Sequence, residues 1–133
     1  MKQVKKSLFL ILCLIIISQR AFSGDIPGGI IASFASGDAS KLSQYFNQTI
    51  ELTFFEKEEI YSKTQAEIIL RDFFAKNPPK QFKILHEGGK ESSKYAIGRY
   101  TSTSKAYRIT FLLKTINSKI FIHQLRIENE YAE

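Results

Sequence analysis

The sequence contains one cysteine, Cys13, and two histidines among its 133 residues. A single cysteine can form neither an internal disulfide nor a metal site built from several thiolates. The two histidines have no aspartate or glutamate at metal-ligand spacing, so no metal site is predicted. The composition, 44% hydrophobic and 24% charged, also lacks the bias of disordered, collagen-like or disulfide-rich chains. An ordinary globular protein with a single domain is therefore expected.

Long hydrophobic runs are also absent. The longest, residues 8–17, has about half of the 20 or so apolar residues that a membrane-spanning helix needs. Three lysines precede this run, and Ala21 and Ser23 stand where a signal peptidase requires small side chains. This pattern predicts a secretory signal peptide over residues 1–23, cleaved just before Gly24. We therefore expect an exported protein, in the periplasm or outside the cell, that does not span the membrane after cleavage.

Cleavage would change both the size and the charge of the chain. It would remove 23 residues, including Cys13 and four basic residues, which lowers the formal net charge from +6 to +2. Residues 24–133 would then form one domain without cysteine, which excludes thiol catalysis and zinc–thiolate sites. The small remaining charge gives little support for nucleic-acid binding, and no glycine-rich phosphate loop follows a strand. No cofactor and no nucleic-acid partner are predicted.

The first part of the predicted mature chain has the pattern of two short helices. The first begins at Asp25 or Ile26, with Pro27 in its first turn, where a missing N–H group is harmless. Gly37 suits a left-handed stop, and Asp38 can cap a second short helix directly afterwards.

A strand and a longer helix are expected next. Apolar and polar residues alternate over residues 49–55, which predicts a half-buried strand. Residues 62–76 then carry one broad apolar stripe at helical spacing, and Asn77-Pro78-Pro79 ends the helix. A capping box can begin this helix at either of two places, Ser62 with Gln65 or Thr64 with Glu67.

The rest of the sequence has the pattern of an antiparallel meander, rich in aromatic and β-branched residues. Four strands are predicted, at residues 82–87, 95–102, 106–115 and 119–128, with reversals at Gly88-Gly89, Thr103-Ser104 and Asn117-Ser118. The order of elements predicts an α+β domain in which helices pack on one side of a curved antiparallel sheet.

Several segments resemble a known superfamily. Residues 36–42, 45–46 and 50–52 are similar to the opening of nuclear transport factor 2-like domains, in which a G-D-A turn joins the first two helices. The predicted mature chain also resembles an exported bacterial family known as domain of unknown function 4783. The segments that carry this likeness are residues 62–70, 82–86, 95–98 and 125–128. The resemblance implies a cone-shaped, cystatin-like α+β fold with its mouth between sheet and helices, and it implies a homodimer as one option, because relatives often pair through the outer face of the sheet.

Side chains two residues apart on a strand point to the same face, which suggests a candidate pocket. Both histidines fall in otherwise apolar rows, and they could share the space between sheet and helices with a guanidinium group and tyrosine hydroxyls. The candidate residues for a small acidic ligand are His86, Arg99, His123, Tyr95 and Tyr107. The alternative is that both histidines are hydrogen-bonded edge or core residues. That alternative is favoured, since shared rows alone do not make side chains converge.

Catalysis is the less favoured function. Enzymes on the resembled scaffold, which are isomerases and dehydratases, typically place an Asp or an Asp–His pair inside the cone. This sequence has no acidic residue between Glu91 and Glu128, and Glu51 points away from the side of its apolar neighbours. The leading hypothesis is therefore a non-catalytic module that binds a small molecule or an envelope protein. The alternatives are an isomerase- or hydrolase-type enzyme with a histidine base, and a structural protein whose interior is filled by Phe82, Phe111, Phe121 and the helix aromatics.

Overall fold

The computed structural model describes residues 26–130. The predicted signal peptide, its cleavage site and the start of the predicted domain at residue 24 lie outside the described residues. The elements, in chain order, are α2 (Gly28–Ser36), α3 (Ala39–Ser43), β1 (Phe46–Phe54), β2 (Lys57–Ser62), α4 (Lys63–Lys76), β3 (Pro79–Lys90), β4 (Ser93–Ser102), β5 (Ala106–Ile116) and β6 (Lys119–Asn129).

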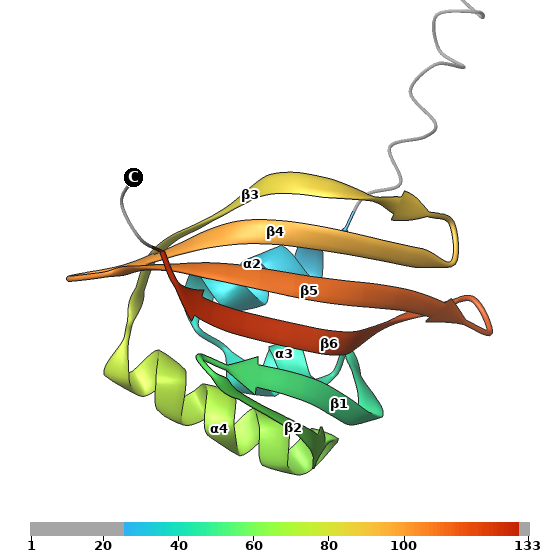
Figure 1. The fold of residues 1–133 in the computed structure, drawn as a ribbon, viewed down its shortest axis with the longest axis horizontal. Coiled ribbons are helices and arrows are strands. Elements are labelled where there is room, and N and C mark those ends of the chain that lie inside the picture. Colours follow the sequence, from blue (N-terminus) through green and yellow to red (C-terminus); the bar gives the residue numbers. More distant parts are fainter. Residues whose placement is uncertain (1–25, 131–133) are drawn as a thin grey trace, which may run out of the picture.

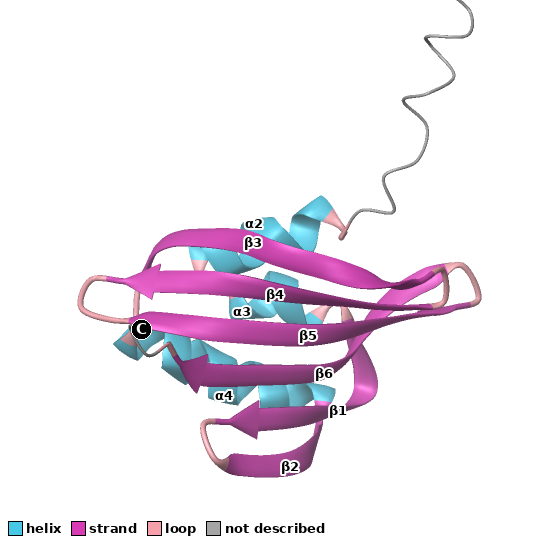
Figure 2. Ribbon diagram, turned by 45° about the horizontal axis from the view of Figure 1, so that its top comes forward, coloured by secondary structure: helices cyan, strands magenta, loops and turns pink. Residues whose placement is uncertain are grey.

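The six strands form one curved sheet in the order β2-β1-β6-β5-β4-β3, and α2, α3 and α4 all lie on the same side of it (Figures 1 and 2). Neighbouring strands are antiparallel except β1 and β6, which run parallel. The side of the sheet that faces the helices is called the inner face below, and the opposite side is called the outer face. The α+β class and the helices on one side are confirmed.

The predicted helix ends have clear local causes. Gly37 adopts the left-handed conformation, with φ of 67°, and ends α2. The Asp38 side chain accepts a hydrogen bond of 2.9 Å from a backbone N–H group of α3. Ser62 and Gln65 form the capping box of α4, which decides between the two starts that the sequence left open. The start of α2 differs from the prediction, because Pro27 occupies the position before the first helical residue.

Strand β2 was not predicted. Its residues are mostly charged or exposed, and it pairs with β1 on one side only, at the edge of the sheet. An edge strand of this kind has no alternating apolar pattern, and charged side chains on it oppose pairing with other chains. The signal on which strand prediction depends was therefore missing from residues 57–62.

The predicted reversal at Gly88-Gly89 was wrong. Strand β3 continues to Lys90, and the chain turns at residues 91–92. Gly88 stands opposite Tyr95 in the sheet, and a β-carbon on Gly88 would lie only 2.6 Å from the Tyr95 hydroxyl oxygen. The glycine is therefore explained by the tyrosine side chain that lies over it rather than by a turn.

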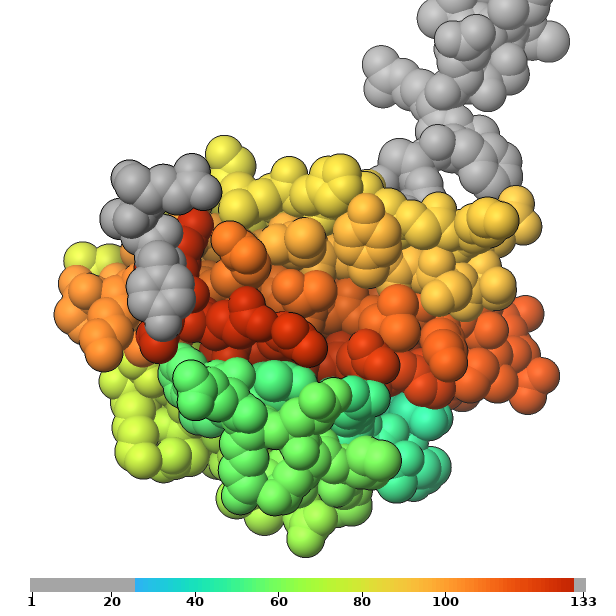
Figure 3. Space-filling model, viewed as in Figure 1, coloured from blue at the N-terminus to red at the C-terminus, as the bar shows by residue number. Residues whose placement is uncertain are grey.

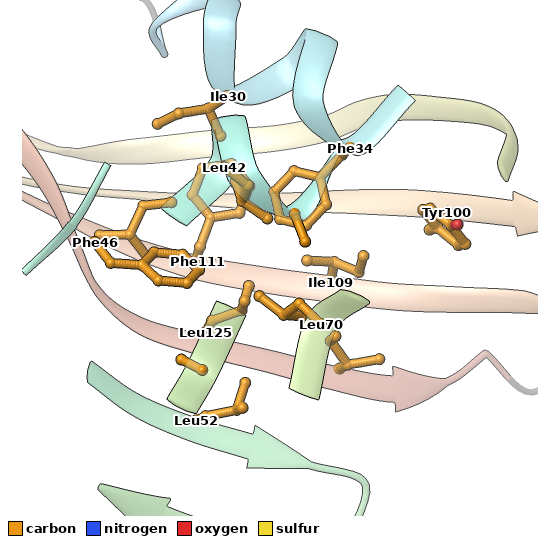
Figure 4. Packing of buried hydrophobic residues seen from close by; sticks show 14 of the residues in the cluster. Ile30, Phe34, Leu42, Phe46, Leu52, Leu70, Tyr100, Ile109, Phe111 and Leu125 are labelled. Atoms are coloured by element: carbon orange, nitrogen blue, oxygen red, sulfur yellow. The ribbon is translucent and has the colours of Figure 1, made fainter. Parts of the chain in front are cut away.

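Aromatic and aliphatic side chains fill the space between the inner face and the helices (Figure 4). Phe34 of α2 is fully buried, and its ring lies 4.7 Å from that of Phe82 and 5.7 Å from that of Phe111, centre to centre. Phe73 of α4 packs at 5.2 to 5.6 Å from three further aromatic rings. Phe121 does not take part as predicted, because it stands opposite the exposed Lys114 and lies outside the buried core.

Candidate functional site

Tyr107 lies on the inner face and is part of the core. Its side chain is 3% exposed, and its hydroxyl donates a hydrogen bond of 2.6 Å to Oδ1 of Asn77, just after α4. Burial raises the pKa of Tyr107, so the phenol stays neutral. Tyr100 is buried beside it and donates to the backbone carbonyl of Asn77. The geometry gives Tyr107 a structural role, holding the end of α4 against the sheet.

Replacing Tyr107 by Phe should destabilise the protein. The change leaves the partly buried Asn77 Oδ1 without this donor, and losing such a hydrogen bond costs about 0.5–1.5 kcal/mol. Urea denaturation should show this loss with an unchanged slope, since the core stays packed. The matched control is Tyr95→Phe at an exposed hydroxyl, for which we expect a change within about 0.5 kcal/mol. Equal effects of the two substitutions would contradict the role given to Asn77.

His86 lies on the outer face, not in the predicted apolar row. The pairing of β3 with β4 shifts by one residue between Ile84 and His86, so Leu85 is the extra residue of a β-bulge. A bulge reverses the faces of the residues that follow it. His86 therefore leaves the side of Phe82 and lies next to Tyr95, with 3.1 Å between the imidazole Nε2 and the tyrosine oxygen.

A second bulge removes His123 from its predicted row. Leu112 pairs with Gln124 and Leu113 with Ile122, so His123 has no partner of its own in the β5–β6 ladder. Its Nε2 atom is buried and has no hydrogen-bond partner among residues 26–130. Burial, and then the charge of Lys114, lower the pKa of His123. Strands β5 and β4 separate β6 from β3, so the two strands that carry the histidines lie about 14 Å apart at the usual strand spacing.

His123 should make stability depend on pH near neutrality. Its pKa is lower in the folded state, so the unfolded chain takes up the proton first as the pH falls. The contribution of His123 to the free energy of unfolding is complete above the ordinary histidine pKa. It is lost as the pH falls from there through the lower pKa of the folded state. The melting temperature should therefore drop between about pH 7.5 and about pH 5.5, and less so in His123→Leu.

The control for this pH experiment is His86→Leu, at the exposed histidine of β3. That variant makes the same change of side chain but leaves His123 and Lys114 in place, so it separates the effect of His123 from that of a histidine-to-leucine change in general. Glu51 acts in the opposite direction, because its pKa is raised and its protonation relieves repulsion as the pH falls. A His123→Leu variant whose melting temperature falls as steeply as the parent's would contradict the assignment.

Arg99 lies on the outer face and is held by one carboxylate. Its guanidinium donates three hydrogen bonds of 2.7 to 2.9 Å to Glu130, which follows β6. This pairing raises the pKa of Arg99 and lowers that of Glu130. Tyr95, Arg99 and His86 thus share the outer face, whereas Tyr107 is on the inner face and His123 sits at a bulge. The five candidate residues do not line one common space.

The outer face carries a trough of about 400 Å³, on the side of the sheet seen in Figure 3. Strands β4, β5, β6 and β1 form its floor. Because paired residues on neighbouring strands stand side by side, the lining is ordered in three cross-strand rows. The first row is Tyr95, Leu112, Gln124 and Glu51, and the second is Ile97, Thr110, Arg126 and Thr53. The third row is Arg108 and Glu128; Arg99 pairs with Arg108 but does not line the trough.

The charged side chains of this trough are unevenly paired. Arg126 donates to Glu128 at 3.1 Å, and Gln124 donates to Glu51 at 3.1 Å. A hydrogen bond that the protonated Glu51 carboxyl donates to Glu58, and then burial, raise the pKa of Glu51. Arg108 forms no hydrogen bond or ion pair within the described part of the chain. Its charge does act on Glu130, where it is one of the causes that lower the pKa of the carboxyl, after the hydrogen bond from Arg99. The trough therefore combines one guanidinium that has no hydrogen-bond partner within residues 26–130 with an apolar end at Tyr95, Ile97 and Leu112.

The sequence contained a signal for this surface that our pocket prediction did not use. On β5, Arg108 and Thr110 alternate with the buried Tyr107, Ile109 and Phe111. The polar row of a half-buried strand marks its solvent face, and the pocket was sought only on the apolar side. The partners of this row on β6 could not be read, because the bulge at His123 shifts them.

Two further properties concern only residues 26–130. No three His, Cys, Asp or Glu side chains in this range come together as a metal site would require. Within the same range, no helix has the length and hydrophobicity needed to cross a bilayer.

Comparison with known proteins gives a family and a fold. Residues 28–128 match the family model described as "Domain of unknown function (DUF4783)". A solved structure of a DUF4783 family protein from Bacteroides ovatus shares 29% identity, with a TM-score of 0.78, over 83% of this chain and 100% of that one. No curated protein matches the chain.

More distant structures agree in fold alone. An NTF2-like protein of unknown function from Shewanella baltica is 11% identical, with a TM-score of 0.61, over 79% of this chain and 88% of that one. A domain of unknown function with a cystatin-like fold from Nostoc punctiforme is 10% identical, with a TM-score of 0.62, over 78% and 72% of the two chains. The predicted nuclear transport factor 2-like, cystatin-like fold is confirmed.

Proposed function

The chain belongs to the DUF4783 family and has the nuclear transport factor 2-like fold, and from that premise we propose that it is a non-catalytic module that binds a small molecule in the trough of its outer face. The observation that carries this proposal is the trough itself. Its volume of about 400 Å³ is within the range of about 300–1,000 Å³ that small-molecule sites occupy. Its lining mixes apolar side chains with a few converging polar groups, as such sites usually do.

The packing between sheet and helices supports a site on the outer face. Phe34, Phe82 and Phe111 are in ring contact there, and Phe73 and Phe74 extend the aromatic core along α4. The buried serines, Ser33, Ser43 and Ser102, each donate a hydrogen bond, to the carbonyl of Gly29, to Glu67 and to the carbonyl of Lys105. The buried tyrosine hydroxyls donate to Asn77. These polar groups are therefore used in holding the fold together, which favours a ligand site on the outer face.

The enzyme alternative required a histidine base in a pocket. His86 and His123 lie on strands separated by two others, and His123 is held at a bulge beside Lys114. No observation brings an imidazole together with a carboxylate inside the fold, so binding is the function that the geometry supports best.

A substitution that fills the trough tests this function. Thr110 stands in the middle row, and Thr110→Trp would occupy the space between Ile97 and Arg126. Thr101→Trp is the matched control, because Thr101 faces the same side of β4 but does not line the trough. In a thermal-shift screen of small metabolites, we expect compounds that stabilise the parent and Thr101→Trp but not Thr110→Trp. Hits that stabilise both tryptophan variants, or no hits at all, would contradict the proposal.

We also propose that the protein is exported, on the evidence of the N-terminal pattern of lysines, apolar residues and small residues at 21 and 23. Export brings the trough into contact with molecules of the periplasm or the medium. N-terminal sequencing of the protein from the extracytoplasmic fraction should give Gly24 as the first residue. Recovery of a chain that still begins at Met1 from the membrane pellet would contradict the proposed export.

A further inference from the structure

The position of Arg108 in the trough is electrostatically unfavourable. It stands directly opposite Arg99 in the β4–β5 ladder, and like charges in that arrangement destabilise a sheet. Glu130 is held by Arg99 through three hydrogen bonds. Glu128, the cross-strand partner of Arg108, accepts from Arg126 instead. Both nearby carboxylates therefore form their hydrogen bonds with other arginines, and Arg108 acts on Glu130 through its charge alone, without a hydrogen bond to a carboxylate within residues 26–130.

Two further donors lie beside Arg108 on the outer face. Thr110 is two residues away on the same side of β5, and Arg126 stands directly opposite Thr110. Arg126 uses its Nη1 atom on Glu128, and a guanidinium has five N–H donors in all. Two guanidinium groups and one hydroxyl thus surround the same spot on the sheet. Such a set matches a carboxylate, which arginine binds through paired charge-assisted hydrogen bonds.

The other end of the trough is apolar. Ile97 stands opposite Thr110, and Tyr95 stands opposite Leu112, one row further along. Tyr95 is 36% exposed, and its hydroxyl lies 3.1 Å from Nε2 of His86, which fixes the position of the ring. Rows two residues apart are separated by about 7 Å along a strand. The apolar end therefore lies about one short side chain away from the basic end.

Resting on the proposed function, we propose that the ligand is a small amphipathic carboxylate. Its carboxylate lies between Arg108, Thr110 and Arg126, and its aromatic or branched aliphatic group lies on Tyr95, Ile97 and Leu112. The carboxylate of the ligand supplies the hydrogen-bonded counter-charge that Arg108 does not find within residues 26–130, where Glu130 acts on it only at a distance. The apolar part is covered only on the side of the sheet, so a compact group fits better than a long chain.

Three probes of known chemistry test this proposal by titration of the purified protein, followed by amide NMR. The probes are 3-phenylpropionate, its neutral analogue 3-phenylpropanamide, and inorganic phosphate. We expect 3-phenylpropionate to bind at least about tenfold more tightly than either of the others and to shift amide signals of β4, β5 and β6. Equal binding of the neutral amide, equal binding of phosphate, or no binding of 3-phenylpropionate would overturn the proposal.

Two variants make the test specific. Arg108→Gln should weaken binding of 3-phenylpropionate by about tenfold or more and change the melting temperature by only a few degrees, because the substitution removes both the repulsion from Arg99 and the attraction to Glu130. Lys83→Gln removes the same charge from the same face, opposite Arg99 but outside the trough, and should change binding by less than about twofold. Equal losses in the two variants would show general charge attraction and would overturn the assigned site.

Failure of this proposal can be separated from failure of the proposed function. If 3-phenylpropionate does not bind but other compounds lose binding in Thr110→Trp, the trough is a binding site for a different chemistry. Light scattering on the same samples tests whether a second copy of the chain occupies this face instead of a small molecule. A dimer that Arg108→Gln or Thr110→Trp dissociates would show that a second copy covers the trough, which would overturn both proposals.

Discussion

Phe73→Asp should leave the protein unfolded at room temperature. Phe73 is 2% exposed and lies at the centre of the contact between α4 and the sheet, touching the rings of Phe54, Tyr100 and Tyr107. Losing a buried phenylalanine side chain costs about 3–5 kcal/mol, and burying an unpaired carboxylate adds to this. Domains of this size usually have a total stability of about 5–15 kcal/mol. Circular dichroism should show a flat melting curve with little native signal.

The control is a change to aspartate on the opposite side of the same helix. Ile68 is 57% exposed, so Ile68→Asp buries no charge and should melt within a few degrees of the parent. Both substitutions introduce aspartate into α4, and their effects on helix propensity are therefore similar. If Phe73→Asp melts like Ile68→Asp, the helix does not pack on the sheet through the side described here.

Phe34→Ala should produce the second large effect, a loss of about 3–5 kcal/mol in the free energy of unfolding. Phe34 is fully buried and joins α2 to two strands through Phe82 and Phe111, and its ring also contacts Phe74 edge-on. The truncation removes these contacts and leaves a cavity that rigid neighbouring strands fill only in part. Denaturant titration measures the loss.

The control for Phe34→Ala is a truncation at an exposed position. Leu85, the extra residue of the β3 bulge, is 46% exposed, and Leu85→Ala should change stability by less than about 1 kcal/mol. A small effect of Phe34→Ala would mean that the space between α2 and the sheet is not densely packed. In that case the interior, and not the outer face, would again be the candidate ligand site.

Local sequence signals predicted most of the helices and strands correctly. Gly37 and Asp38 place the break between α2 and α3, and the capping box of Ser62 starts α4, because each of these depends on neighbouring backbone groups only. The turn at Asn117-Ser118 is a further case, since both residues adopt positive φ values in a tight hairpin. Interactions within a few residues of chain can be read directly from the order of residues.

The candidate site could not be read in the same way. The regular alternation of side chains along a strand predicted His86 and His123 in apolar rows. A bulge at Leu85 and another at His123 interrupt that alternation. One extra residue in a strand turns every later side chain to the other face. No residue near either bulge indicates in the sequence that a bulge is present.

The sequence by itself determined the α+β class, the helix ends, the apolar row of β5 and the pattern of the N-terminal segment. Only the tertiary structure decided that β2 joins the sheet, that β1 runs parallel to β6, and that Glu51, Arg108 and Arg126 line one trough. The physical reason is the separation along the sequence of the residues that interact. Caps, turns and amphipathic faces depend on residues close in sequence, whereas the trough depends on the register between strands as much as 73 residues apart, as for Glu51 and Gln124.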